Sequence, residues 1–270
     1  MTSSARAAPA ASSMAAFGLT VIRHGETRYN KEKIMQGQGV DEPLTDTGFK
    51  QANAAGMYLR HIRFTHVFTS DLLRARQTTA SILRNSQHCK EIPVKCDARL
   101  RERNYGVAEG RPLGDLKAMA KEAGQPYLSF TPPGGETLDE VKARVKDFFE
   151  HICHLVAQET AEGTSTPSLP NHQAGLARDA NSEGAAEGLA ANILVVSHGA
   201  YMRNWIGYFT SDLRCTLPAT LTKAELSSLT PNTGISRFLV KLEVREDGLQ
   251  PKIHCLFLNR GDHLHTLSDS

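Results

Sequence analysis

The chain has 270 residues, of which 40% are hydrophobic and 22% are charged, a composition typical of a folded protein with one large domain or two small ones. Its net charge of +2 excludes a general electrostatic attraction to nucleic acid or to an anionic membrane, so anion binding needs a local cluster of cations. No apolar run approaches the roughly 20 residues that a membrane-spanning helix needs.

The five cysteines have irregular spacing and include no C-x-x-C pair. This pattern favours neither a disulfide framework nor a zinc site, and it is typical of reduced thiols in a cytoplasmic compartment. Residues 1–13 are small and polar and lack the apolar core of a secretory signal. We therefore expect a flexible leader at 1–13, followed by a single domain at 14–270.

The first half of the chain alternates predicted strands and helices. Residues 17–25, FGLTVIRHG, form an apolar, β-rich run that ends in glycine, which predicts a buried parallel strand. A helix is predicted within 44–62, with Thr45 or Asp46 as its N-cap. The next predicted elements are a strand at 64–70, a helix at 71–85 and a short strand within 92–100.

The second half begins with a Pro/Gly turn and a long helix. Thr137 with Glu140 three residues later is a capping-box pattern, which predicts a helix start. The segment at about 160–190 is rich in Ala, Gly, Ser and Pro, and we expect a mobile surface insertion there. The remaining predicted elements are a strand at 192–199, a helix at 200–209 and two strands around an Asp247–Gly248 turn.

Strands that alternate with helices predict an α/β three-layer sandwich, with helices on both faces of a mostly parallel sheet. The final hairpin adds antiparallel strands at one edge. In such sheets, ligands bind beyond the carboxyl ends of the strands. Two predicted strands end in Arg-His-Gly and Ser-His-Gly, at His24 and His198. We expect both imidazoles to face one pocket.

Cations and an acid lie near the same strand ends. Arg23 precedes the first histidine, and Arg74 lies near the start of the helix that follows the second strand. Guanidinium groups fit phosphate oxygens and keep their charge at any working pH. Phosphoryl transfer to histidine expels an alkoxide that needs a proton, and Glu102 is the candidate acid. Glu26 is closer in sequence to the histidine, but a loop anchor or an ion pair is an alternative role for it.

Six motifs occur in a characteristic order: RHGET with Asn30, PLTDTGFKQA, SDLLRARQT, LRERNYG, PPGGET and VVSHGAYMR. In this order they resemble the motifs of the histidine phosphatase superfamily, the group of phosphoglycerate mutases and fructose-2,6-bisphosphatases. The resemblance covers about residues 18–210, apart from the low-complexity insertion. It implies a phosphoglycerate mutase-like fold for the domain at 14–270.

The resemblance also implies a role for each matched residue. The implied catalytic residues are His24, which becomes phosphorylated, Glu102, which donates the proton, and His198. The implied phosphate-binding residues are Arg23, Arg74 and Asn30, and the implied substrate-binding residues are Arg203, Tyr105 and Gln36. We expect a neutral nucleophile with a protonated His198 and a protonated acid. No metal or cofactor is expected, because arginines and histidines supply the positive charge.

The implied activity is that of a metal-independent phosphatase with a phosphohistidine intermediate, whose partner is a small phosphorylated metabolite. The resemblance suggests hydrolysis of fructose 2,6-bisphosphate to fructose 6-phosphate, which lowers glycolytic flux, or of a related metabolite such as 2,3-bisphosphoglycerate. A phosphoglycerate mutase and a weakly active scaffold protein with the same fold are the alternatives. A cytoplasmic location is expected, and the resemblance also admits a mitochondrial-associated or nuclear one. No protein partner is identified from the sequence.

Overall fold

In the part of the chain that the structure describes, six strands form one mixed sheet in the order β3-β2-β4-β1-β5-β6. The structure is a computed structural model, and it describes residues 15–163, 189–222, 225–226, 228–246 and 248–267. The strands are β1 (Ala15–Arg23), β2 (His66–Thr69), β3 (Val94–Cys96), β4 (Ala191–Ser197), β5 (Ile235–Arg245) and β6 (Gly248–Arg260). The first four are parallel, and β5 and β6 add an antiparallel hairpin at the edge beyond β1. The predicted mostly parallel sheet is confirmed.

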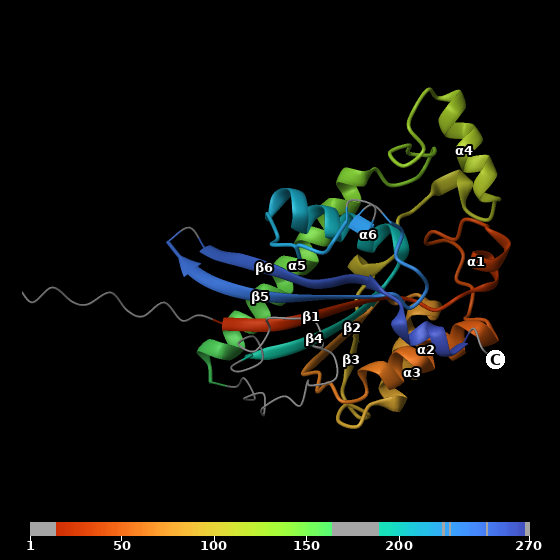
Figure 1. Ribbon diagram of the computed structural model, residues 1–270. Coiled ribbons are helices and arrows are strands. Elements are labelled where there is room, and N and C mark those ends of the chain that lie inside the picture. The colour runs from red at the N-terminus through yellow and green to blue at the C-terminus, as the bar shows by residue number, and fades with distance from the viewer. Residues whose placement is uncertain (1–14, 164–188, 223–224, 227, 247, 268–270) are drawn as a thin grey trace, which may run out of the picture.

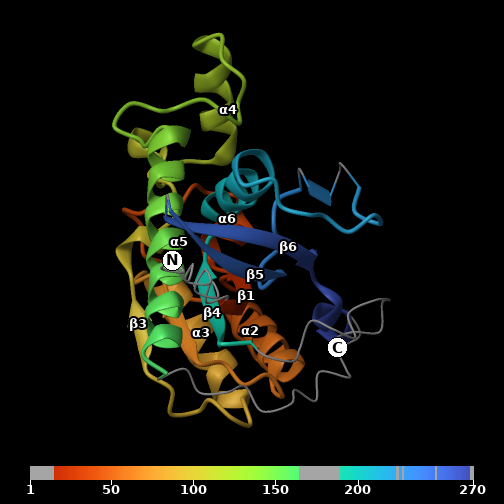
Figure 2. The same cartoon turned by 90° about the vertical axis from the view of Figure 1, so that its left-hand side faces the viewer.

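Helices cover both faces of this sheet, as Figures 1 and 2 show. One face carries α5 (Leu138–Ala161) and α6 (Gly199–Gly207), and the other carries α2 (Asp46–Leu59) and α3 (Leu73–Asn85). The shorter helices are α1 (Arg28–Glu32), α4 (Leu113–Glu122), η1 (Ala98–Leu100), η2 (Gly106–Ala108), η3 (Tyr208–Asp212) and η4 (Asp262–Leu267). The expected three layers are therefore present, and α4 stands away from the sheet in both views.

The central strands β1 and β4 are mostly apolar because both of their faces are covered. Successive side chains of a strand point to opposite faces. Leu19 and Val21 of β1 therefore belong to the core beneath α5 and α6, with Phe148 and Trp205, whereas Ile22 belongs to the core beneath α2 and α3. This double burial explains why the sequence of β1 is a continuous apolar run rather than an alternating one.

Capping residues fix the predicted helix starts. The hydroxyl of Thr45 accepts a hydrogen bond from the N–H of Gly48 at 3.0 Å, and Thr137 and Glu140 form the expected capping box at the start of α5. The sequence analysis did not predict α1 or α4. Helix α4 contributes Leu116 and Ala120 to a small apolar cluster apart from the two cores of the sheet. The stretch at 101–116 that leads into it is rich in glycine, so no regular element is expected there.

Two predicted segments lie largely or wholly outside the described residues. These are the leader at 1–13 and most of the insertion, residues 164–188. The insertion was expected to begin at about residue 160, but α5 continues to Ala161, so the first residues assigned to the insertion are helical. Asp247 of the predicted hairpin turn also lies outside the described residues. Among the helices that the structure describes, none is both long enough and apolar enough to cross a membrane.

Arg237 of β5 is a buried cation with no carboxylate partner among the described residues. Its side chain is 5% exposed, and its guanidinium group donates one hydrogen bond, to the hydroxyl of Thr20 at 3.4 Å. Burial lowers the pKa of Arg237 to about 10. A buried charge without a close counter-ion carries a desolvation cost that one neutral hydrogen bond does not offset.

We expect Arg237→Met to raise the free energy of unfolding, by about 1–4 kcal/mol, because an apolar side chain of similar length removes the buried charge and keeps the packing. Urea denaturation of the two proteins at the same pH measures the difference. The substitution Arg245→Met, at the exposed end of the same strand, is the control and should change stability little. A less stable Arg237→Met protein would contradict this assessment.

Candidate active site

The parallel pairing of β1 with β4 places two histidines side by side. Arg23 and Ser197 are partners in register, and His24 and His198 follow them directly. The ring centroids of the two histidines are 5.1 Å apart, and their planes are inclined by 57°. His24 is 2% exposed and His198 is 0% exposed. The expected convergence of the two imidazoles at the carboxyl ends of the strands is therefore observed.

The ring of His24 is held in one tautomer. Its Nδ1 lies 2.7 Å from the carbonyl oxygen of Gly25 and donates to it, which leaves Nε2 with its lone pair. Burial lowers the pKa of His24 well below 6.5, and the charges of Arg74 and Arg23 lower this pKa further. His24 is therefore a neutral imidazole with a free nitrogen, the form that attacks phosphorus.

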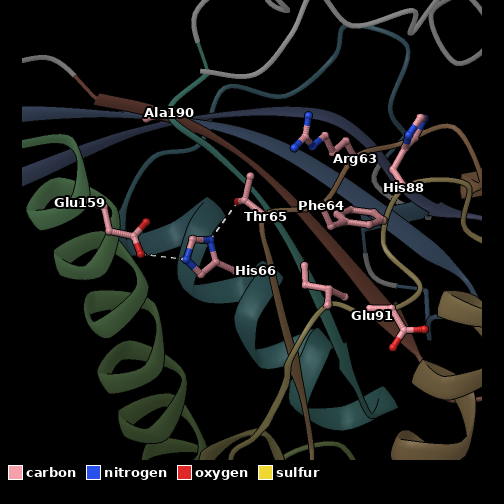
Figure 3. Close-up of a pocket in the computed structure, with 9 residues that line it drawn as sticks. Arg63, Phe64, Thr65, His66, His88, Glu91, Glu159 and Ala190 are labelled. Carbon is pink, nitrogen blue, oxygen red and sulfur yellow. Dashed lines mark hydrogen bonds and ion pairs between the residues drawn. The ribbon is translucent and has the colours of Figure 1, made fainter. Parts of the chain in front are cut away.

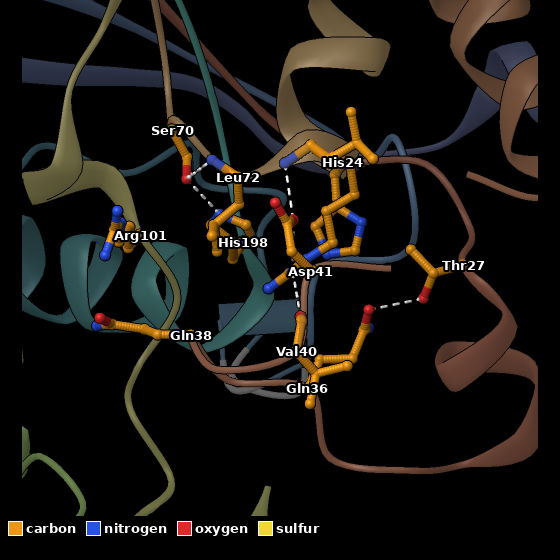
Figure 4. A network of polar contacts seen from close by, with 12 residues as sticks. His24, Thr27, Gln36, Gln38, Val40, Asp41, Ser70, Leu72, Arg101 and His198 are labelled. Carbon is orange, nitrogen blue, oxygen red and sulfur yellow. Dashed lines mark hydrogen bonds and ion pairs between the residues drawn. The ribbon is translucent and has the colours of Figure 1, made fainter. Parts of the chain in front are cut away.

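The surroundings of His198 determine its charge. Its Nε2 lies 2.8 Å from the hydroxyl of Ser70 (Figure 4), and its Nδ1 is buried without a partner among the described residues. Burial, followed by the charges of Arg74, His24 and Arg23, lowers the pKa of His198 well below 6.5. Without a bound anion, burial and the two guanidinium groups therefore favour a neutral His198, and its protonation beside a phosphoryl group stays a prediction.

Arg23 and Arg74 bring positive charge to the histidines. Arg74, in the first turn of α3, is 0% exposed and donates to the carbonyl oxygens of Gly37 at 2.8 Å and Val40 at 3.1 Å. Arg23 donates to the carbonyl oxygen of Thr230 at 2.7 Å. Burial lowers the pKa of Arg23, and it lowers that of Arg74 to about 10.

Three buried polar atoms of this cluster have no hydrogen-bond partner in the described part of the chain. They are Nε of Arg23, Nε of Arg74 and Nδ1 of His198. Buried polar groups are almost always hydrogen-bonded, so three such atoms beside one nucleophile indicate a ligand site. Two guanidinium groups and an imidazole are suited to a tetrahedral anion such as phosphate.

Glu102 lies at the amino end of α6. Its Oε1 accepts hydrogen bonds from the backbone N–H groups of Arg103 at 2.8 Å and Tyr201 at 3.0 Å, and its Oε2 accepts one from Ala200 at 3.1 Å. Burial lowers the pKa of Arg23 and Arg74, and the negative charge of nearby Glu102 partly opposes this lowering. Oε2 has fewer partners than Oε1 and is the oxygen with room for a proton.

Asn30 and Gln36 are linked to the cluster indirectly. Oδ1 of Asn30 accepts hydrogen bonds from the N–H of Thr27 and from Nδ2 of Asn232, both at 3.1 Å, and Nδ2 of Asn232 also lies 3.1 Å from the carbonyl oxygen of His24. Gln36 accepts a hydrogen bond from the hydroxyl of Thr27 at 2.9 Å (Figure 4). Both residues thus stabilise the start of α1, and their direct contact with substrate stays a prediction.

Tyr105 and Arg203 lie in a cavity beside the cluster. This cavity has a volume of about 380 Å³, and its wall includes Tyr127 and Ala200. It borders the anion site, because the N–H of Ala200 also donates to Glu102. Burial and the charge of Glu102 raise the pKa of Tyr105, so its phenol stays neutral. Aromatic surface beside a cation suits the part of a substrate that is not transferred.

A second cavity, of about 420 Å³, opens at the amino end of β2, the end opposite the histidines (Figure 3). His66 there lies 3.1 Å from a carboxylate oxygen of Glu159 and 2.9 Å from the hydroxyl of Thr65. These polar groups bind one another and do not point to a ligand. Among the described residues, no group of three His, Cys, Asp or Glu side chains is placed to hold a metal ion.

Sequence reasoning missed a group of residues that support the site. The hydroxyl of Thr78 accepts from the N–H of Gly25 at 3.0 Å, and that of Ser70 contacts His198 at 2.8 Å. The segment 230–234 contacts both Arg23 and His24. Its sequence, TPNTG, has turn-forming residues, but a turn signal does not reveal that the segment lies against a distant strand end.

The chain belongs to the histidine phosphatase superfamily, because residues 19–163 match the family model "Histidine phosphatase superfamily (branch 1)". It is 54% identical over 269 residues to "Fructose-2,6-bisphosphatase TIGAR" of Mus musculus, which covers 95% of this chain and 99% of the mouse protein. It is 51% identical over 271 residues to the Xenopus laevis protein of that name, covering 93% and 96%. The fold is similar to that of a phosphoglycerate mutase from Bacillus anthracis, with a TM-score of 0.66, 20% identity and coverage of 93% and 96%.

The low pKa values of the two histidines predict a pH-dependent stability. In the unfolded chain histidine titrates near 6.5, so below that pH the unfolded state binds protons that buried His24 and His198 do not. The free energy of unfolding should therefore fall as the pH is lowered from about 7, by up to about 1.4 kcal/mol per pH unit for each histidine. Urea denaturation of the protein and of His198→Asn at several pH values tests this. An unchanged slope in the variant would contradict the lowered pKa of His198.

Proposed function

We propose that this protein is a phosphatase that removes the 2-phosphate of fructose 2,6-bisphosphate through a phosphohistidine at His24. One observation carries the proposal: a neutral histidine, with Nδ1 fixed by the carbonyl of Gly25, lies among three buried polar atoms that lack partners in the described part of the chain. The choice of the sugar bisphosphate rests on the name of the relatives that are about half identical to this chain.

In the first step, Nε2 of His24 attacks phosphorus, a P–N bond forms and the P–O bond to the sugar breaks. Arg23, Arg74 and Nδ1 of His198 bind the oxygens of the phosphoryl group in transfer. The incoming dianion adds negative charge beside His198, which favours the protonated ring there. Glu102 gives its proton to the leaving oxygen, so that fructose 6-phosphate departs as an alcohol.

In the second step, Glu102 acts in the reverse sense. Its carboxylate takes a proton from a water molecule, the water oxygen attacks phosphorus, and the P–N bond breaks. His24 returns to its neutral form and inorganic phosphate leaves. The backbone N–H bonds to Glu102 hold the carboxyl group in place through both steps. Neither step needs a group beyond these side chains and water.

The alternative activities differ in what becomes of the phosphoenzyme. A phosphoglycerate mutase returns the phosphoryl group to a second oxygen of its substrate, whereas a phosphatase releases it to water. A scaffold protein with a vestigial site would form no phosphoenzyme. The complete set of His24, Glu102, Arg23, Arg74 and His198 supports an active enzyme, and the TIGAR-named relatives support hydrolysis.

We also place the protein in the cytoplasm, where a reducing environment fits its five free cysteines. Mitochondrial association, a nuclear location and an effect on glycolytic flux stay predictions. Recovery of the protein in a secreted or other oxidising fraction would contradict the cytoplasmic assignment.

With fructose 2,6-bisphosphate labelled in the 2-phosphate, we expect an acid-labile phosphoenzyme and the accumulation of free phosphate. His24→Ala should abolish both, because it removes the attacking nitrogen. His61→Ala, on the exposed surface, is the matched control. The values of kcat/KM for a panel of phosphorylated metabolites test whether the protein prefers fructose 2,6-bisphosphate to 2,3-bisphosphoglycerate. Transfer of the label to a second organic acceptor would indicate a mutase, and full activity of His24→Ala would refute the nucleophile.

For Glu102→Gln we expect a folded protein and a loss of about 10²–10⁴ in kcat, because the amide keeps the shape but has no proton to give. The loss should be smaller for a substrate with a good leaving group, such as p-nitrophenyl phosphate, whose departing oxygen needs no proton. Comparison of the two substrates in both proteins is the measurement. Equal losses for the two substrates would count against the acid role.

A further inference from the structure

Thr233 has an unusual backbone conformation. It belongs to the segment 230–234 that precedes β5, its φ is 56°, and its side chain is 0% exposed. A β-branched residue rarely adopts this left-handed conformation, because its side chain is crowded against the backbone there. Such conformations persist only where the surrounding structure enforces them, and they cluster at functional sites.

The segment that contains Thr233 holds the nucleophile strand. The N–H of Thr233 lies 3.1 Å from the carbonyl oxygen of Arg23 and 3.3 Å from that of His24. Asn232 donates from its amide to the same oxygen of His24 at 3.1 Å. The carbonyl of Thr230 accepts from the guanidinium group of Arg23 at 2.7 Å. The position of the nucleophile and that of one phosphate-binding arginine thus both depend on this segment.

The side chain of Thr233 is fixed from the C-terminal end of the chain. Its hydroxyl lies 3.0 Å from Nε2 of His263, in the short helix η4 (Asp262–Leu267). His263 is buried, and its ring centroid lies 5.8 Å from that of Tyr58 on α2. Burial lowers the pKa of His263 to about 4, so the ring is neutral at physiological pH and its charge plays no part.

We propose that His263 is a positioning residue of the phosphoryl-transfer site. It acts through the hydroxyl of Thr233, holds the segment 230–234 in its left-handed turn and so fixes Arg23 and His24. The inference rests on the proposed function for its effect on rate, but its geometric part concerns the position of His24 alone. Residues 230–234 and η4 both lie beyond residues 19–163, the part of the chain that matches the family model.

His263→Ala should lower kcat about ten- to a hundredfold, because a displacement of about 1 Å at the reacting groups costs that much. KM should change less, since Arg74 and His198 still bind the phosphate. The rate of phosphohistidine formation in a single turnover should fall with kcat. His263→Gln, whose amide is able to bond the Thr233 hydroxyl, should recover much of the rate. Leu264→Ala, on the same helix, is the control for loosened packing and should leave kcat near that of the starting protein.

A double-mutant cycle separates positioning from general stability. Glycine adopts a φ of 56° without strain, so in Thr233→Gly the turn no longer needs the bond to His263. Adding His263→Ala to Thr233→Gly should therefore lower kcat less than threefold. Equal effects of His263→Ala in both backgrounds would overturn the proposal, because His263 would then act independently of Thr233. A normal kcat in His263→Ala would overturn it as well.

The ring resonances of His24, followed by NMR, provide a readout that does not depend on the substrate. They should shift in His263→Ala and stay in place in Leu264→Ala. If the protein hydrolyses no sugar bisphosphate but these shifts appear, the proposed function fails and the positioning role stands. If hydrolysis occurs and His263→Ala leaves the His24 resonances unchanged, the positioning role fails and the function stands.

Should His263→Ala not fold, kcat and the His24 resonances are compared between His263→Gln and His263→Leu instead. Equal kcat values in these two variants would overturn the proposal.

Discussion

The site depends on one structural constraint, the in-register parallel pairing of β1 with β4. Because Arg23 lies opposite Ser197, the next residues of the two strands, His24 and His198, are carried to the same point although 174 positions separate them in sequence. A shift of the register by one residue would turn every side chain of β1 to the opposite face and would separate the histidines. Leu19 and Val21 fit one core and Ile22 fits the other, so such a shift would move each side chain into a core that it does not fit, and close packing therefore opposes it.

Burial then sets the chemistry of the groups that meet there. Two guanidinium groups and two imidazoles lie close together in a site where burial lowers the pKa of all four. The arginines keep their charge under these conditions, whereas the histidines lose theirs. Burial and the charges of the arginines therefore keep His24 neutral. A bound anion would reduce the repulsion between the cations and would give hydrogen-bond partners to the donors that lack them in the described part of the chain. The instability of the site without an anion is the physical basis of its affinity for one.

Sequence reasoning found what local patterns encode and missed what tertiary contacts create. The strands, the capped starts of α2 and α5 and the two histidines followed by glycine all have local signals. The neutrality of His198 has none, because it depends on burial and on Arg74, which approaches from another helix. The left-handed conformation of Thr233 has none either, because it is set by contacts with β1 and η4. The helix α4 was missed for a local reason, because the glycine-rich stretch at 101–116 obscures its start.

The arrangement separates the chemical step from the recognition of the rest of the substrate. The groups that we propose to bind and transfer phosphate lie close to the sheet. His24 and His198 follow the ends of β1 and β4, Arg74 lies in the first turn of α3, and backbone N–H groups in the first turn of α6 hold Glu102. The adjoining cavity is partly lined by the small cluster around α4, which contributes Leu116 to its wall. Helix α4 itself stands away from the sheet (Figure 1). A fold can therefore be shared while the choice of substrate differs, because the proposed site lies on the sheet and part of the adjoining cavity is formed by elements apart from it.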